Sequence, residues 1–268
     1  MSPIATYLDF NAGSPAKPEV ANAVSEAMAA GGNPSSVHRV GRLARATVDR
    51  AREQVAAMVG ATGPQVIFTS GGTEANAQAL SAARGQKIGP VVVSSVEHPS
   101  VREGAAALTP SVIHAPVDGD GVLDLVAFEE ILATNDCAAV SLMLANNETG
   151  VIQPVAEAAK LAHTRGLKIH CDGAQAPGKI PVDFQSLGVD YLTLAAHKIS
   201  GPQGVGAVIV RDGEALPPML RGGGQESGQR AGTENVPGIA GFGVAADLAG
   251  EDLARADMLA GLRDAMEA

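Results

Sequence analysis

The sequence has 268 residues, of which 46% are hydrophobic and 18% are charged, a balance typical of a folded globular protein. Its formal net charge of −10 argues against nucleic acid as the main partner. The longest apolar runs are too short to span a membrane, and the first residues lack a signal-peptide pattern. Because the two cysteines show neither a disulfide framework nor metal-ligand spacing, we expect a cytoplasmic protein without a metal site.

Short apolar segments alternate with helical segments along most of the chain. A basic helix is predicted over 35–59 and a mainly helical end over 236–268. The predicted strands are 65–70, 90–95, 111–117, 138–145, 167–172, 191–194 and 205–210. This alternation predicts an α/β fold with a mostly parallel central sheet flanked by helices. We expect an N-terminal segment at 1–20, one large domain at 21–250 and a helical tail at 251–268.

Lys198 follows the strand at 191–194 and precedes a Gly/Pro turn. A lysine at a strand end commonly extends into water, whereas a lysine kept in a cleft can act as a nucleophilic amine that forms a Schiff base. Asp172 ends the strand at 167–172 and also has two interpretations. It is either a turn former or the carboxylate that keeps the ring nitrogen of a pyridoxal cofactor protonated. Ligands of such sheets bind at the carboxyl ends of the strands, where both side chains are predicted to lie.

The remaining polar motifs also fall at strand ends. In "FTSGGTEAN", Gly72 and Thr73 form either a phosphate site at a helix start or an ordinary helix cap made by Thr73. His98 in "SSVEHPS" is either structural or a catalytic group that stacks on a ring. The amides of Asn146 and Asn147 follow the strand at 138–145, and "RAGTEN" offers a second Gly-Thr step for a phosphate. Together these motifs indicate a pyridoxal 5'-phosphate (PLP) site in which Lys198 carries the cofactor.

The sequence also resembles a known family, the class V aminotransferase-like cysteine desulfurases. The resemblance covers residues 5–250 and rests on motifs that occur in the family's order: "YLDFNAGSP", "GNPSSVHRVGR", "FTSGGTEAN", "EHPSV", "NNETG", "HCDGAQAPGKIPVD", "AAHKISGPQGVGA" and "GGGQESGQRAGTEN". It implies the type I fold of PLP-dependent transferases and a homodimer. It also implies transfer of sulfur from L-cysteine to a cysteine of an acceptor or scaffold protein, with release of L-alanine, for iron-sulfur cluster or other sulfur-cofactor synthesis.

The resemblance assigns a role to each matching residue. Lys198 corresponds to the Schiff-base lysine, Asp172 to the partner of the pyridine nitrogen, and His98 to the ring-stacking group that assists proton transfer. The other implied cofactor contacts are Gln175 and Asn147 at the phenolic oxygen, Gly72, Thr73 and His197 at the phosphate, and Thr233 at the phosphate of the other subunit.

Two features depart from the family pattern. Ala195 stands where many members carry a serine that bonds the phosphate. The family's mobile-loop cysteine and its substrate-binding arginine lie beyond residue 268, and Cys137 and Cys171 have the surroundings of core residues. We therefore expect the large cofactor domain of such an enzyme, as a fragment or a shortened product without turnover. The alternatives are another class V aminotransferase, a selenocysteine or cysteine-sulfinate lyase, and a non-catalytic PLP-binding protein.

Overall fold

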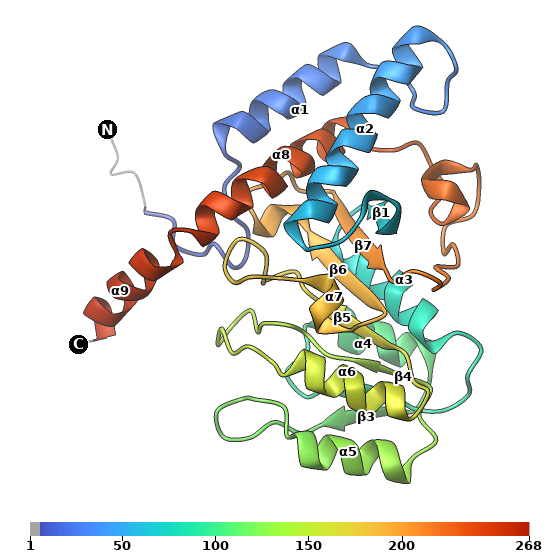
Figure 1. The fold of residues 1–268 in the computed structure, drawn as a ribbon, viewed down its shortest axis with the longest axis vertical. Coiled ribbons are helices and arrows are strands. Elements are labelled where there is room, and N and C mark those ends of the chain that lie inside the picture. The colour runs from blue at the N-terminus through green and yellow to red at the C-terminus, as the bar shows by residue number, and fades with distance from the viewer. Residues whose placement is uncertain (1–5, 268) are drawn as a thin grey trace.

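The computed structural model describes residues 6–267 and shows an α/β protein built on one seven-stranded sheet (Figure 1). The strands are β1 (Val66–Thr69), β2 (Val91–Ser94), β3 (Val112–Ala115), β4 (Ala139–Ser141), β5 (Ile169–Asp172), β6 (Tyr191–Ala195) and β7 (Gly206–Val210). The helices are α1 (Pro18–Ala30), α2 (Arg39–Met58), α3 (Gly72–Arg84), α4 (Pro99–Leu108), α5 (Leu125–Thr134), α6 (Val155–Thr164), α7 (Phe184–Leu187), α8 (Val236–Leu253) and α9 (Ala256–Glu267).

The sheet is mostly parallel, as the sequence predicts. Its strand order is β1-β7-β6-β5-β4-β2-β3. β3, β2, β4, β5 and β6 pair in parallel, while β7 is antiparallel to both of its neighbours, β1 and β6. β1 consequently points in the same direction as β6. Among the described strands, all except β7 bring their carboxyl ends to one edge of the sheet, and the polar motifs lie there.

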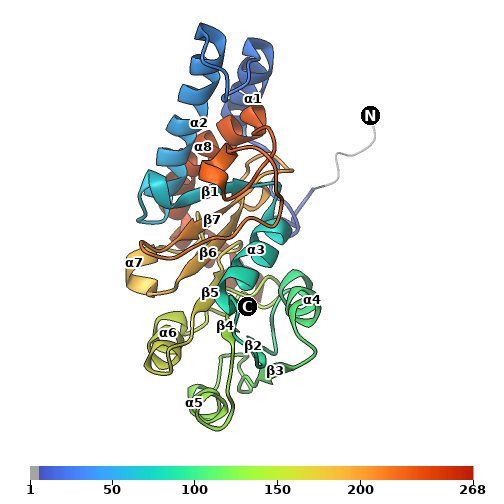
Figure 2. The same ribbon diagram turned by 90° about the vertical axis from the view of Figure 1, so that its right-hand side faces the viewer.

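Helices cover both faces of the sheet (Figure 2). α3 and α4 lie on one face, and α5, α6 and α7 lie on the other. The alternation of side chains along each strand builds the two cores. In β2, Val91 and Val93 pack with Leu80 of α3 and Val101 of α4, whereas Val92 belongs to the core on the opposite face.

α1, α2 and α8 form a helical group beside the β1 end of the sheet (Figure 1). Two glycines of α8 allow the close packing in this group. A Cβ added to Gly243 would lie 2.7 Å from the Ala51 Cα, and one added to Gly241 would lie 2.6 Å from Val24 Cγ2. α9 extends away from the sheet (Figure 1). Within residues 6–267, the apolar stretches of the helices fall short of what a membrane crossing requires.

The segment predicted as a strand over 138–145 pairs on both sides only in its first part, β4. Its second part stays beside β5, since Leu144 N donates to Asp172 O at 2.9 Å. On the β2 side the ladder stops, and the buried side chain of Glu97 replaces it by accepting the Met143 N–H at 2.6 Å. The strand prediction was therefore too long because a side chain takes over from the neighbouring backbone.

Candidate active site

Lys198 lies in a short 3-10 turn, Ala196–Lys198, that directly follows β6. The side chain is half-buried, and its Nζ donates to Asn11 O and, at 3.2 Å, to Ala12 O. Burial lowers the pKa of this amine, while the charges of Asp172 and Asp9 act in the opposite direction. Of the two interpretations that the sequence allows, the structure has the lysine turned into the protein.

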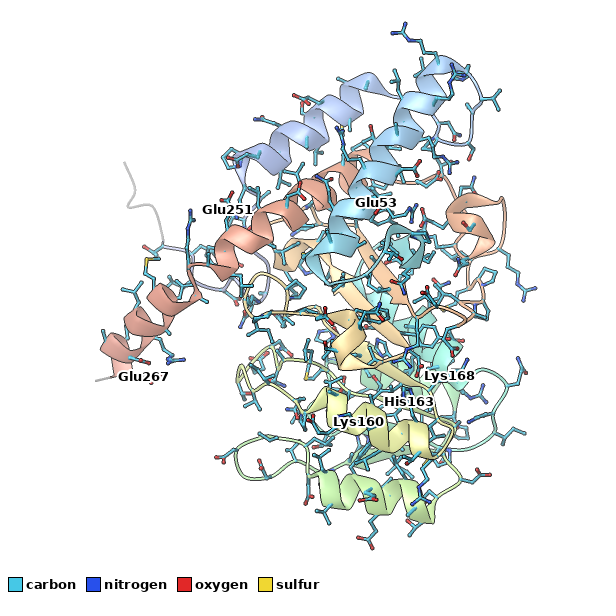
Figure 3. The ribbon with its side chains drawn as sticks, viewed as in Figure 1. Glu53, Lys160, His163, Lys168, Glu251 and Glu267 are labelled. Atoms are coloured by element: carbon cyan, nitrogen blue, oxygen red, sulfur yellow. The ribbon has the colours of Figure 1, made fainter. Side chains whose placement is uncertain are left out.

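A second lysine, Lys179, approaches the same place, which the sequence did not indicate. Its Nζ donates to Asn11 Oδ1 at 2.9 Å and to Gln175 Oε1. Burial and the charge of Lys198 lower its pKa to about 8. Lys168 instead lies at the opposite end of β5, near His163, where it contacts Glu214 (Figure 3).

Asp172 ends β5 and is buried, with 6% of its surface exposed. Its Oδ1 accepts the Ala174 N–H at 3.0 Å, and its Oδ2 accepts Asn76 Nδ2 at 2.7 Å. A buried carboxylate is stable only where donors replace the water that it has lost. Asp172 combines the turn contact with a bond to α3, so it has more than the local role of a turn former.

The glycine motif places the start of α3 at the carboxyl end of β1. Gly71, at φ 152°, is the residue that precedes the helix, and Thr73 lies inside its first turn, so the alternative in which Thr73 is an ordinary helix cap is wrong. Gly71 is approached closely by Gly206 of β7, where an added Cβ would lie 2.7 Å from the Gly71 carbonyl carbon. The first amides of α3 have no acceptor within the helix and are free to meet an anion.

His197 precedes Lys198 and is half-buried. Burial lowers the pKa of its ring, and the charge of Lys198 lowers it further. Its carbonyl oxygen accepts the Ser14 N–H at 2.8 Å, which fixes the N-terminal segment over the 3-10 turn.

His98 precedes α4 and is exposed. Its Nδ1 accepts the Ser100 N–H at 3.1 Å and lies 2.7 Å from Ser100 Oγ. The ring is therefore held by the first turn of α4, and its other nitrogen is turned away from that contact.

Asn11 connects the amide residues of the site. It lies within the motif "YLDFNAGSP", but the sequence assigned no role to it. Its carbonyl oxygen accepts Gln175 Nε2 at 2.9 Å, and its Nδ2 donates to Asn147 O at 3.2 Å. Asn147 itself is half-buried, while the neighbouring Asn146 is buried and donates to Val96 O at 3.1 Å. Asn146 thus stabilises the loop, and Asn147 is the more accessible amide.

Thr233 is exposed on the loop before α8 and lies apart from the contacts of Lys198 and Asp172. With Ser70 and Arg230 it lines a cavity of about 260 Å³. The loop is anchored by Glu226, whose carboxylate accepts both terminal nitrogens of Arg52 at 2.7 Å and the Phe68 N–H at 2.9 Å. This anchor ties the loop to β1.

Both cysteines are buried, as predicted. Cys171 lies within β5 and Cys137 lies just before β4. Burial raises the pKa of both thiols, and nearby carboxylates add to the effect. Neither thiol is available as a thiolate nucleophile.

Comparison with known proteins shows the family of the chain. The family model of the class V aminotransferases matches residues 6–267. A cysteine desulfurase from Rhodobacter capsulatus is 42% identical to this chain, over 100% of the chain and 71% of that protein. The chain belongs to the class V aminotransferases, in the family of the cysteine desulfurases. Members of this family depend on PLP.

Other cysteine desulfurase relatives and solved structures cover most of the chain. Cysteine desulfurase IscS from Dictyoglomus turgidum is 41% identical over 91% of this chain and 63% of its own length. A NifS-like protein from Rickettsia africae superimposes with a TM-score of 0.86 and 37% identity, covering 92% of this chain and 69% of that one. The chain spans 62% to 66% of the length of several curated relatives.

The residues at the sheet edge fit the PLP on which members of this family depend. A buried carboxylate, Asp172, has the charge that a pyridinium nitrogen requires, and it is close enough to Lys198 to act on the pKa of that amine. A Cβ added to Gly72 would lie 3.3 Å from the Ala195 Cβ, and one added to Gly71 would meet no atom within 4 Å. There is therefore open space next to Gly71, whereas Ala195 packs against Gly72. Open space beside the first amides of a helix is suitable for a phosphate.

Glu97 allows a test of the electrostatics of this site. Burial, and to a smaller extent the Asp172 charge, raises its pKa from 4.5 to about 8. Because the folded pKa lies above the unfolded one, its contribution to stability is complete below about pH 4.5 and is lost as the pH rises to about 8. Glu97→Gln keeps an acceptor for the Met143 N–H and cannot ionise. We expect the two proteins to be equally stable near pH 4 and the variant to be more stable by a few kcal/mol near pH 8.

Urea unfolding between pH 4 and 9 measures this difference. Glu103→Gln, which removes an exposed carboxylate from α4, is the matched control. A stability difference between Glu97→Gln and the native protein that is the same at every pH would contradict the assignment.

Proposed function

We propose that this chain forms the cofactor domain of a cysteine desulfurase that takes sulfur from L-cysteine and passes it to a protein thiol. The observation that supports it most is the placement of Asp172 and Lys198 at the ends of the neighbouring strands β5 and β6, where the Asp172 charge acts on the Lys198 amine. A similar solved structure, with a TM-score of 0.85 and 31% identity, is described as SspA in complex with cysteine. In the proposed domain division, residues 21–250 bind PLP, between the segment 1–20 and the helical tail 251–268.

In this proposal the cofactor is held from three directions. Lys198 carries it through Nζ, and the lowered pKa of this amine favours the neutral form that can attack a carbonyl. Asp172 would accept a hydrogen bond from the protonated ring nitrogen and keep that proton on the ring. The amides of Gly72 and Thr73 hold the phosphate together with His197. PLP, when bound, withdraws electrons from the α-carbon of an amino acid.

The remaining side chains orient the ring and move protons. His98 covers the ring face and holds a proton at the nitrogen that does not face Ser100. Gln175 and Asn147 are assigned to the phenolic-oxygen side of the cofactor, where Asn11 holds both. Lys179 lies beside Gln175, and burial together with the charge of Lys198 lowers the pKa of Lys179 to about 8.

The reaction balances without an added oxidant. The bond between the β-carbon and the sulfur of L-cysteine breaks, the carbon gains a proton and becomes the methyl group of L-alanine, and the sulfur bonds to the acceptor thiol as a persulfide. The acceptor must be a thiolate that can approach the site. Cys137 and Cys171 are buried, so the proposal assigns this role to neither.

We further propose a cytoplasmic homodimer that serves an acceptor or scaffold protein. Thr233 is exposed on a loop that Glu226 anchors to β1, as expected for a residue that reaches the phosphate of a second copy. Two free thiols are consistent with a reducing compartment.

The first prediction concerns the lysine that carries PLP. Borohydride reduction of the loaded protein should fix the cofactor on the peptide that contains Lys198, and Lys198→Ala should lose that label completely. Lys168→Ala, at the far end of β5, is the matched control and should be labelled normally. Peptide mass spectrometry decides, and a label on Lys179 would show that the two neighbouring lysines have been assigned in the wrong order.

The second prediction concerns Thr233. If its hydroxyl reaches the phosphate of the partner, Thr233→Ala should weaken PLP binding roughly tenfold, the value of one hydrogen bond to a charged group. Thr134→Ala, on the exposed end of α5, is the control. Sedimentation must show a dimer under the same conditions. A monomer that retains PLP with unchanged affinity would argue against a shared site.

The third prediction separates cofactor binding from turnover. A protein of residues 1–268 should bind PLP and yet produce no steady sulfide from L-cysteine above the background of free PLP, because both of its thiols are buried. Sulfide release over many turnovers that Cys137→Ser or Cys171→Ser abolishes would identify a nucleophile that this proposal excludes.

A further inference from the structure

A buried network of polar side chains lies between α3 and the sheet, directly behind Asp172. Its centre is Asn76 of α3, which is 3% exposed. Asn76 Nδ2 lies 2.7 Å from Asp172 Oδ2 and 3.0 Å from Ser100 Oγ, and its Oδ1 accepts the hydroxyl of Thr193. One amide thus contacts β5, β6 and the first turn of α4.

Chemistry fixes the direction of each bond on the sheet side. The Asp172 carboxylate can only accept here, so the nitrogen of the Asn76 amide faces it and the oxygen faces Thr193. Because the Thr193 hydroxyl donates to that oxygen, it accepts from His170 Nε2 at 3.1 Å. Burial lowers the pKa of His170 to about 4, so its ring is neutral and its Nδ1 accepts from Ser141 Oγ at 2.9 Å. The hydrogen bonds that lead from Asp172 through Asn76, Thr193 and His170 to Ser141 therefore have one consistent set of donors and acceptors.

On the other side of Asn76, a second set of hydrogen bonds leads through Ser100 to His98. The Ser100 backbone N–H points at His98 Nδ1 from 3.1 Å, which makes that nitrogen an acceptor. The Ser100 hydroxyl, 2.7 Å from the same nitrogen, must then donate its proton to it. A lone pair of Ser100 Oγ remains for the second N–H of Asn76. Since Nδ1 accepts both bonds, the neutral His98 ring carries its proton on Nε2.

We propose that Asn76 is a positioning residue that fixes the Asp172 carboxylate and, through Ser100, the orientation and tautomer of the His98 ring. The role for catalysis rests on the proposed function, in which Asp172 and His98 act on the cofactor. The network itself consists of this chain's own side chains, so it can be tested without cofactor.

A purely structural role for Asn76 predicts something different. In that case the amide only ties α3 to its neighbours, and its removal lowers stability while the hydrogen bond at His98 Nδ1 is unchanged. The positioning role predicts two effects. Loss of the Asn76 bond to Asp172 changes the electrostatics of the carboxylate, and loss of the Asn76 bond to Ser100 changes the hydrogen bonding of His98 Nδ1.

The apo protein provides the first measurement. Long-range ¹H–¹⁵N spectra of ring-labelled histidine, recorded where the ring is neutral, should show His98 with its proton on Nε2 and with a hydrogen-bonded Nδ1. In Ser100→Ala the Nδ1 signal should move toward that of a nitrogen with fewer hydrogen bonds. Asn76→Leu, similar in shape but without donors, should move it in the same direction by a smaller amount. Ser95→Ala, an exposed serine just after β2, is the control and should leave it unchanged.

The PLP-loaded protein provides the second measurement. The pH midpoint of its visible absorption should shift by about half a pH unit or more in Asn76→Leu, since the charged Asp172 carboxylate loses a hydrogen bond from the Asn76 amide. It should stay in place in Ser100→Ala. The proposal is overturned if native His98 carries its proton on Nδ1, or if Asn76→Leu changes neither signal. The native spectrum decides even if Asn76→Leu does not fold. A native protein that shows the His98 pattern but binds no PLP would refute the proposed function and leave the network intact.

Discussion

The carboxylate of Asp172 is buried at the end of β5, and a buried carboxylate is costly unless donors surround it. Much of the local structure meets this requirement. The turn after β5 supplies the Ala174 N–H, and α3 supplies the Asn76 amide. α3 can do so because it begins immediately after the Gly71 turn and packs across β5 and β6. The helix start that can hold a phosphate and the amide that holds the carboxylate therefore come from one element, separated by one turn of helix.

The N-terminal segment closes the site from the other side. Asn11 contacts four residues of the site. Its backbone carbonyl accepts from Lys198 and Gln175, and its side-chain amide bonds to Lys179 and Asn147. Two lysines beside each other would repel, and burial together with this repulsion lowers the pKa of Lys179 to about 8. The carbonyl oxygens of the N-terminal segment offset part of this cost. Residues far apart in sequence thus depend on one short segment for their arrangement.

The sequence predicted the fold and the strand-end positions of Lys198, Asp172 and His98 because those features are local. Apolar periodicity sets the strands, and parallel pairing brings their ends to one edge. The sequence could not predict the roles of Asn11 and Asn76, because these depend on contacts between residues 24 or more positions apart. The length of β4 was overestimated for a similar reason, since the distant Glu97 side chain ends the ladder.

The chemistry of Asn76 also limits what the network can do. A primary amide is neither an acid nor a base near neutral pH, so it cannot pass a proton between Asp172 and His98, although it bonds to Asp172 and to the serine that holds His98. His170, the titratable group on the other side of Thr193, is kept neutral by burial and adds no charge. The two groups assigned to the cofactor are therefore fixed relative to each other while their protons stay separate. Such an arrangement suits a site in which one group must keep a proton on the ring nitrogen and the other must exchange one.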